Sequence, residues 1–311
     1  MDGLLIVDKP AGPTSHDVVS RMRRALREKR IGHTGTLDPA ATGVLVLVLG
    51  KATRLAKFLS GSDKSYEAVV RLGFSTDTAD AEGEPIGSVW LGPLPARDAI
   101  DAALDAFRGT FLQQPPAYSA KKIDGTRSHR LARAGLAALP ALSSVTTYVI
   151  DIVDVGRDSV TLRIDCSAGF YVRSLAHDLG ERLGVGAHLT SLRRTRTGDF
   201  TIEQAMGLGA AERDPPAAAD AMIPLAAMLP RMAAVTLTAD GVLRALHGRE
   251  IRPSDAMGAT DLGSGATDRR ETRDSGPRTA CIRLLDQGGG LIGIATPAAA
   301  PGVLHPSVVL V

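Results

Sequence analysis

Residues 44–49 constrain the fold more than any other part of the chain, because all six, VLVLVL, are apolar. A strand without a polar face is buried on both sides, so it belongs in the middle of a sheet that other elements cover. The run is too short to cross a membrane as a helix, which takes roughly 18 apolar residues. With 44% hydrophobic and 23% charged residues, the chain has the composition of a soluble globular protein. We therefore expect a buried central strand and no membrane span.

The glycine-rich segment immediately before this strand, residues 32–43 (GHTGTLDPAATG), contains the first candidate for chemistry. Its three glycines permit backbone conformations closed to other residues, and Pro39 restricts Asp38 before it. An acid held on a rigid turn beside a buried strand suits a nucleophile or a general base. An aspartate before a proline is also a common turn former, so both interpretations stay open on these residues alone. A phosphate-binding loop is not favoured, because no Gly-Lys-Ser or Gly-Lys-Thr follows the glycines.

Hydrophobic periodicity predicts the elements around this segment. Alternation in residues 64–72 turns Tyr66 toward the interior, and Thr14 with Asp17 forms the capping pattern that opens a helix. Expected strands lie at residues 4–7, 44–49, 64–72, 143–155 and 159–166, and further helices at 52–59, 96–107 and 170–183. Strands and helices mix without a regular strand-helix-strand repeat. We therefore predict an α+β fold, a mixed and mainly antiparallel sheet with flanking helices.

Composition also predicts a division into two domains. Residues 207–230 are rich in Ala, Pro and Gly, which places a boundary near residue 230. The parts on either side are residues 1–230 and a small β-rich unit of residues 231–311. Inside that unit, residues 258–278 are almost free of apolar side chains, so we expect a disordered loop there.

Charge is unevenly distributed, although the net charge is only +2. Residues 1–64 contain eleven Lys and Arg against six Asp and Glu, and many of the arginines fall in an expected helix at 21–30. A local basic face suits a polyanionic partner, whereas a solvated helix face is the plain alternative. The two cysteines and seven histidines have no metal-ligand spacing and no disulfide framework, which predicts a cytoplasmic protein without a metal site.

Three further polar residues are ambiguous when each is considered alone. The His33 ring either stacks on a base or forms a hydrogen bond within its loop. Tyr66 is by default a core tyrosine whose hydroxyl finds a hydrogen-bond partner. Arg173 opens the helix expected at 170–183, where the helix dipole disfavours a cation. We therefore expect Arg173 to have an anionic partner elsewhere in the structure.

Six segments in order give these signals a common interpretation. They are VDKPAGPTSHDVV (7–19), GHTGTLDPAATGVL (32–45), KSYEAVVRLGFSTDTADAEG (64–83), QQPPAYSAKKIDGTR (113–127), CSAGFYVRSLAHDLG (166–180) and AHLTSLRRTRTGDF (187–200). Together they resemble the TruB family, the bacterial tRNA pseudouridine-55 synthases, over about residues 3–206. The resemblance implies a pseudouridine-synthase core, and it gives residues 231–311 the look of a reduced PUA-like RNA-binding domain.

The resemblance implies isomerisation of a T-loop uridine in tRNA, without cofactor, metal or obligate protein partner, by a monomer. Asp38 would be the catalytic nucleophile, Arg173 its ion-pair partner, and Tyr66 the ring that stacks on the uracil and removes the C5 proton. The substrate-binding residues would be His33, Tyr171, Leu192, Asp80, Lys9 and Pro10. The RNA-backbone contacts would be Arg21, Arg23, Arg24, Arg27, Arg30, Lys121, Lys122, Arg127, Arg130 and Arg133.

Two departures from the family pattern concern packing or RNA affinity only: Ala40 replaces a larger apolar residue and His129 replaces a tyrosine. Two other functions remain as alternatives. One is an RNA-binding or tRNA-folding protein with a vestigial catalytic loop, against which intact Asp38, Tyr66 and Arg173 argue. The other is an Asp-dependent phosphoryl or glycosyl hydrolase, which lacks a recognisable second carboxylate or metal cluster.

Overall fold

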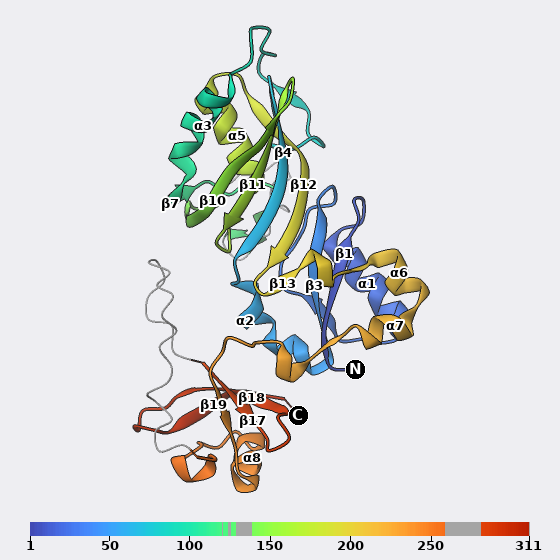
Figure 1. Cartoon of the computed structure of the whole chain (residues 1–311), viewed down its shortest axis with the longest axis vertical. Helices are drawn as coiled ribbons and strands as arrows, with labels where there is room; N and C mark the ends of the chain where they lie inside the picture. Colours follow the sequence, from blue (N-terminus) through green and yellow to red (C-terminus); the bar gives the residue numbers. More distant parts are fainter. Residues whose placement is uncertain (120, 124–125, 129–138, 259–280, 311) are drawn as a thin grey trace.

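The computed structural model of the chain describes residues 1–119, 121–123, 126–128, 139–258 and 281–310. Figure 1 shows an elongated molecule in which a large sheet with flanking helices forms most of the length. A small second sheet lies at the end that contains the C-terminus. The α+β architecture expected from the sequence is confirmed.

The large sheet has eleven strands and is mixed, with mainly antiparallel neighbours. Its main path runs in the order β14 (Met206–Gly207), β1 (Gly3–Lys9), β3 (Thr42–Leu49), β12 (Ala187–Thr197), β4 (Lys64–Leu72), β11 (Ser159–Cys166), β10 (Ser143–Val155) and β7 (Gly109–Gln113). Three short strands pair at its sides, β2 (Ile31–His33) with β3, β13 (Phe200–Thr201) with β12, and β15 (Ile223–Pro224) with β1. Strand β3 is buried at every residue after Thr42, as its apolar run predicts.

Strand β12 is the longest of the described strands that the sequence did not lead us to expect. It pairs in parallel with β3 and antiparallel with β4, and so joins the two halves of the large sheet. Register shifts between Leu189 and Ser191 and between Arg194 and Arg196 interrupt its alternation. Bulges of this kind re-aim side chains and hide the period-2 signal from the sequence.

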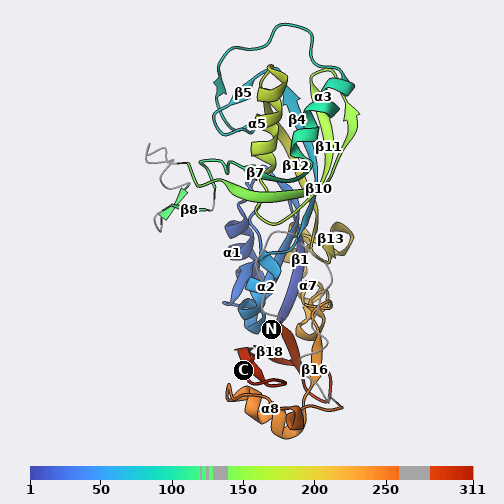
Figure 2. The ribbon, with the colours of Figure 1, turned by 90° about the vertical axis from the view of Figure 1, so that its left-hand side faces the viewer.

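Helices cover both halves of the large sheet, the half that includes β4, β10 and β11 and the half that includes β1 and β3 (Figures 1 and 2). The apolar residues of α3 and α5 pack on β4, β10 and β11, while those of α1 and α6 pack on β1 and β3. The helices are α1 (Ser15–Ala25), α2 (Ala56–Ser60), α3 (Arg97–Leu104), α5 (Val172–Leu183), α6 (Leu208–Arg213), α7 (Pro215–Asp220) and α8 (Ala239–Leu246). Short 3₁₀-helices are η1 (Gly50–Leu55), η2 (Asp105–Phe107), η3 (Ile202–Gln204), η4 (Leu225–Ala227) and η5 (Pro253–Asp255).

Helix α1 begins as expected but ends early. Thr14 and Asp17 form both hydrogen bonds of the capping box. The helix expected over residues 21–30 is confirmed as far as Ala25 and is wrong beyond it, because α1 ends there and Arg27 turns into the left-handed region with φ 51°. This turn lets the chain reverse into β2, so Arg27 and Arg30 lie beyond the helix.

The second sheet consists of β16 (Ala234–Thr236), β17 (Ile282–Leu285), β18 (Leu291–Pro297) and β19 (Leu304–Val309), accompanied by α8. The chain changes sheet between Pro224 and Ala234. Leu291, Ile294 and Val308 share one apolar cluster with residues of β1 and β3, so the small sheet is packed against the large one. Two short hairpins complete the fold, β5 (Ser75–Thr76) with β6 (Pro85–Ile86), and β8 (Lys122–Ile123) with β9 (Thr126–Arg127).

Some expectations fall outside the described residues. These concern His129, Arg130, Arg133 and the loop expected at 258–278, of which only Gly258 is described. Lys122 and Arg127 are placed through their backbone in β8 and β9.

Candidate active site

The loop between β2 and β3 presents Asp38 on a firmly held backbone. Ser15 on α1 accepts a hydrogen bond from the Leu37 amide at 2.8 Å and donates one to the Leu37 carbonyl at 3.0 Å. On the other side, the Gly12 amide donates to the Pro39 carbonyl at 2.9 Å. The Asp38 side chain itself is 44% exposed. Its neighbours are fixed, and its carboxylate stays accessible.

Lys9 holds the same loop through hydrogen bonds from its ammonium group. Its ammonium group donates to the carbonyls of Pro39 at 2.9 Å and Ala41 at 2.7 Å, and to that of Pro10 at 2.9 Å. Lys9 is fully buried, and desolvation lowers its pKa to about 8. Pro10 is exposed and contributes its carbonyl to this arrangement. Lys9 therefore holds the loop through backbone contacts.

Arg173 brings two carboxylates together at the N-terminus of α5. Its Nε atom lies 3.1 Å from Asp38 Oδ2, and its Nη1 atom lies 3.3 Å from Asp80 Oδ2. It also donates to the Tyr118 carbonyl at 2.7 Å. Thr78 Oγ1 and the Glu82 amide donate to Asp80 Oδ1 and fix that carboxylate. Arg173 thus has anionic partners that offset the unfavourable dipole of α5.

The pKa of Asp38 reflects opposing influences. Desolvation raises it, and the nearby charge of Asp80 adds to that rise. Arg173 and then Lys9 lower it, but the net pKa stays above that of an ordinary aspartate. Because the carboxylate is partly exposed, solvent screens each of these effects.

Two tyrosine rings lie close enough to Asp38 for its charge to raise their pKa values. Tyr66 on β4 is 8% exposed, and burial is the main cause of its raised pKa. Tyr171, which immediately precedes α5, is half-buried, and burial is also the main cause of its raised pKa, which Ser119 and Arg173 partly oppose. Leu192 lies opposite Ala68 in the β12–β4 ladder. It packs against both the apolar cluster under α3 and α5 and the cluster under α1 and α6. His33 is partly exposed at the end of β2.

Two residues near the site escaped sequence reasoning. Gln113 forms hydrogen bonds with both the amide and the carbonyl of Tyr171, at 2.8 and 3.0 Å. Arg194 on β12 donates to the carbonyls of Val44, Thr36 and Gly35 beneath the loop. Both lie inside quoted motifs, QQPPAY and LRRTRTG, but only an assignment of β12 as a strand with bulges could have pointed to Arg194.

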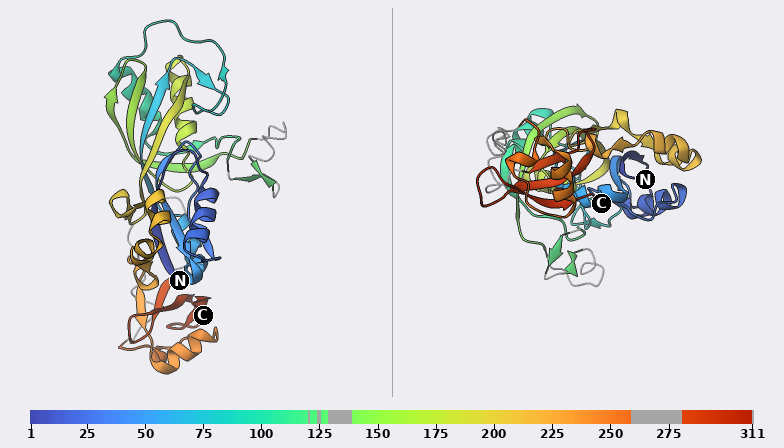
Figure 3. Two further views of the ribbon diagram at one scale, coloured as in Figure 1. Left: turned by 90° about the vertical axis from the view of Figure 1, so that its right-hand side faces the viewer. Right: turned by 90° about the horizontal axis from the view of Figure 1, so that it is seen from below.

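The arginines expected to contact RNA divide into two groups. Arg21 forms a two-pronged ion pair with Glu212 on α6, and Arg23 donates to the Ile31 carbonyl at 2.6 Å. Arg24, Arg27 and Arg30 are exposed. Figures 2 and 3 show the β8 hairpin projecting on the side of the molecule where α1 lies. Lys121, just before that hairpin, donates to Ser143.

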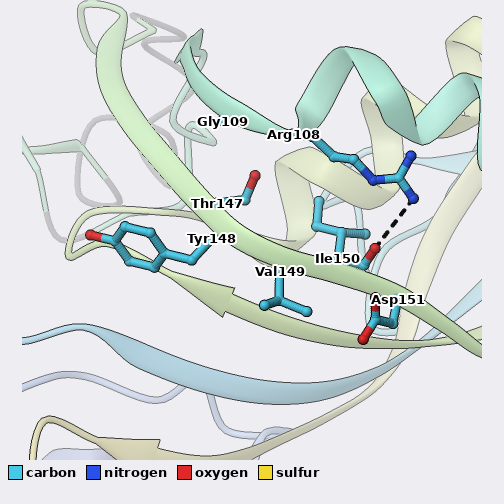
Figure 4. Close-up of a pocket in the computed structure, with 7 residues that line it drawn as sticks. All are labelled: Arg108, Gly109, Thr147, Tyr148, Val149, Ile150 and Asp151. Atoms are coloured by element: carbon cyan, nitrogen blue, oxygen red, sulfur yellow. Dashed lines mark hydrogen bonds between the residues drawn. The ribbon is translucent and has the colours of Figure 1, made fainter. Parts of the chain in front are cut away.

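Two surface hollows lie away from the residues of this site. One is lined by residues of β10 and the start of β7, where Arg108 reaches the Ile150 carbonyl (Figure 4). Another lies between Trp90 and the end of α5. Neither contains a residue proposed from the sequence for catalysis or binding.

The described residues lack two further features. None of their helices has the length and apolarity to span a membrane. Nor do these residues include a cluster of His, Cys, Asp or Glu able to bind a metal ion. The expected cytoplasmic location and the absence of a cofactor stay predictions.

Comparison with known proteins bears on the same residues. The family model described as TruB family pseudouridylate synthase, N-terminal domain, matches residues 23–172, and that of the tRNA pseudouridylate synthase B C-terminal domain matches residues 173–212. The tRNA pseudouridine synthase B of Solibacter usitatus is 40% identical over 316 aligned residues, covering 100% of both chains. That of Thermobifida fusca is 46% identical, covering 84% of this chain and 90% of its own.

A solved structure, a Cbf5-Nop10-Gar1 complex, contains a similar fold. It matches with a TM-score of 0.71 and 25% identity, covering 98% of this chain and 84% of the other. The sequence relationship goes further than a shared fold, since it extends along the whole chain. The chain therefore belongs to the TruB family and is a pseudouridine synthase.

Proposed function

We propose that this enzyme converts the uridine at position 55, in the T loop of tRNA, to pseudouridine, with Asp38 as the catalytic nucleophile. The observation that carries the proposal is the accessible Asp38 carboxylate, 3.1 Å from buried Arg173 on a loop held by Lys9. The relatives named tRNA pseudouridine synthase B support the choice of tRNA.

The reaction breaks the N1–C1′ bond, turns the uracil in the site and joins C5 to C1′. The C5 proton leaves and N1 gains one, so the product has the formula of the substrate. Asp38 adds to the ring, attacks C1′ or removes a sugar proton, and each of these routes requires the ionised carboxylate. Arg173 favours that form by its charge, which offsets part of the desolvation.

The pocket walls would be Tyr66, Tyr171 and Leu192, with Asp80 orienting Arg173 at its edge. A base stacked in the T loop cannot reach Asp38, so the nucleotide must flip out, and His33 would take its place in the loop. Stacking of the uracil on Tyr66 would compensate for the lost base stacking.

Contacts to RNA phosphates would come from the exposed Arg24, Arg27 and Arg30, together with the basic residues around the β8 hairpin. Such contacts position the RNA without reading its sequence. We assign residues 1–230 to the synthase domain and residues 231–311 to a PUA-like RNA-binding domain, with the enzyme working as a monomer in the cytoplasm.

The test follows tritium release from unmodified tRNA that carries [5-³H]uridine, with the modified position mapped by carbodiimide treatment and primer extension. The wild-type enzyme should release tritium and block primer extension at position 55. Asp38→Asn keeps the shape but removes the charge, so we expect tRNA binding to survive and the rate to fall by at least roughly a thousandfold.

The matched control is Asp199→Asn, which makes the same change in a carboxylate that pairs with Arg231 at the surface and with no residue of the site. Its activity should equal that of the wild type. A wild-type protein that binds tRNA without releasing tritium would make it a binding or folding protein. An active Asp38→Asn enzyme would remove Asp38 from the mechanism.

A further inference from the structure

Arg194 is an unusual residue for the middle of a sheet. It is 2% exposed, yet it forms no salt bridge with any carboxylate of the residues that the structure describes. A buried cation is costly unless its donors are satisfied. A residue with this cost needs a physical reason for its presence.

The donors of Arg194 converge on the catalytic loop. Its Nε atom donates to the Val44 carbonyl at 2.7 Å, Nη1 to that of Thr36 at 3.3 Å and Nη2 to that of Gly35 at 3.0 Å. These carbonyls belong to the stretch that precedes Asp38 and to the strand that follows it. Arg194 therefore joins the two ends of the loop.

The same side chain also lies beside Tyr66. Arg194 is directly opposite Tyr66 in the β12–β4 ladder, close enough for its charge to lower the pKa of Tyr66 against the larger effect of burial. Residues directly opposite each other in a ladder share one face of the sheet. The bulge that follows Arg194 adds local twist at this point. Gly43 lets the backbones approach, because a Cβ atom there would lie 2.2 Å from the Arg194 carbonyl oxygen.

We propose that Arg194 is a positioning residue that joins the catalytic loop to Tyr66 and holds the Tyr66 oxygen where it receives the C5 proton. This rests on the proposed function. The C5 proton passes to the Tyr66 oxygen as the hydroxyl proton moves to solvent. The C–H electron pair restores the C5–C6 double bond, the π pair of the C6–N1 double bond left by the rearrangement moves to N1, and N1 takes a proton from solvent. The Arg194 charge favours ionised Tyr66 and so assists this proton transfer, although burial opposes it more strongly.

The test compares Arg194→Lys and Arg194→Gln with Tyr66→Phe, and either Arg194 variant that folds suffices. The matched control is Arg193→Gln, one residue earlier on β12, where the side chain is more exposed and pairs with Asp8 at 2.8 Å. Each protein is assayed on unmodified tRNA made with uridine or with [5-²H]uridine, and circular dichroism checks the fold.

We expect the Arg194 variants to lose roughly 10- to 100-fold in kcat with KM changed less than about threefold. Slow C5 proton removal should enlarge their deuterium isotope effect toward that of Tyr66→Phe. The double variant Arg194→Lys, Tyr66→Phe should be about as slow as the slower single variant, because both act on one step. Arg193→Gln should keep the wild-type kcat and isotope effect.

Folded Arg194 variants with wild-type kcat or an unchanged isotope effect would overturn the proposal, as would multiplied losses in the double variant. If the wild-type enzyme itself releases no label from C5, the proposed function fails instead. The two failures are therefore distinguishable.

Discussion

Positively charged side chains are buried around the catalytic loop, whereas most of those in the last turn of α1 and just after it are exposed. Lys9, Arg173 and Arg194 are 0%, 6% and 2% exposed. Lys9 and Arg194 direct their donors at backbone carbonyls, and Arg173 divides its donors between carbonyls and the Asp38 and Asp80 carboxylates. Arg24, Arg27 and Arg30 are exposed. The buried set stabilises one arrangement of the loop, whereas the exposed set is free to meet a polyanion. Burial, more than residue type, decides what a cation does in this chain.

The largest expected effect comes from Lys9→Met, which keeps the side-chain length and removes the donors. The buried Ala41 carbonyl then loses its Lys9 donor, at a cost of about 1–3 kcal/mol. The Pro10 carbonyl loses the same donor, while the Pro39 carbonyl keeps only the Gly12 amide. We expect a decrease of at least about 2 kcal/mol in the free energy of unfolding. Chemical denaturation measures this decrease, and exposed Arg24→Met is the control with a change near zero.

Lys9 also gives that comparison a pH signature. Its pKa in the folded protein is about 8, below the ordinary value of 10.5, so the unfolded chain binds more protons between these pH values. Stability from this residue therefore rises with pH across that window, and Lys9→Met should remove the rise. An identical pH dependence in the variant and the wild type would show that Lys9 does not titrate in this way.

Arg173→Gln should have the next largest effect, on activity more than on stability. Without the arginine, the pKa of Asp38 rises further above its ordinary range, because desolvation and Asp80 then act unopposed except by Lys9. The acid limb of the kcat profile should therefore move to higher pH. Arg231→Gln breaks a surface pair with Asp199 and should leave the limb unmoved. An unmoved limb in Arg173→Gln would mean that Asp38 ionisation does not control the rate.

Sequence patterns predicted those parts of the site that depend on residues close together in the chain. The apolar run of β3, the capping box of α1 and the inward side of Tyr66 need only neighbours in the chain. The need of Arg173 for an anion followed from its place at a helix start. The ion pairs with Asp38 and Asp80 meet that need.

The difference between Arg193 and Arg194 could not be foreseen in the same way. They are adjacent and chemically identical, yet one pairs with Asp8 near the surface and the other is buried under the loop. That choice depends on the register of β12 between β3 and β4, and the bulges of β12 hide this register from the sequence. Likewise, only the fold shows that Glu212 on α6 pairs with Arg21.

The smallest expected effect concerns the exposed set. Arg24→Glu with Arg27→Glu should weaken tRNA binding and reduce the log–log salt slope by roughly 0.7–0.9 for each phosphate that is no longer neutralised. The choice of uridine should not change, because phosphate contacts carry no sequence information. Arg21→Gln is the matched control: its guanidinium already pairs with Glu212, so stability should fall slightly while the salt slope stays the same. Equal salt slopes in the wild type, the double variant and Arg21→Gln would show that the RNA binds another face. The exposed arginines would then have no role in RNA binding that sets them apart from the buried cations.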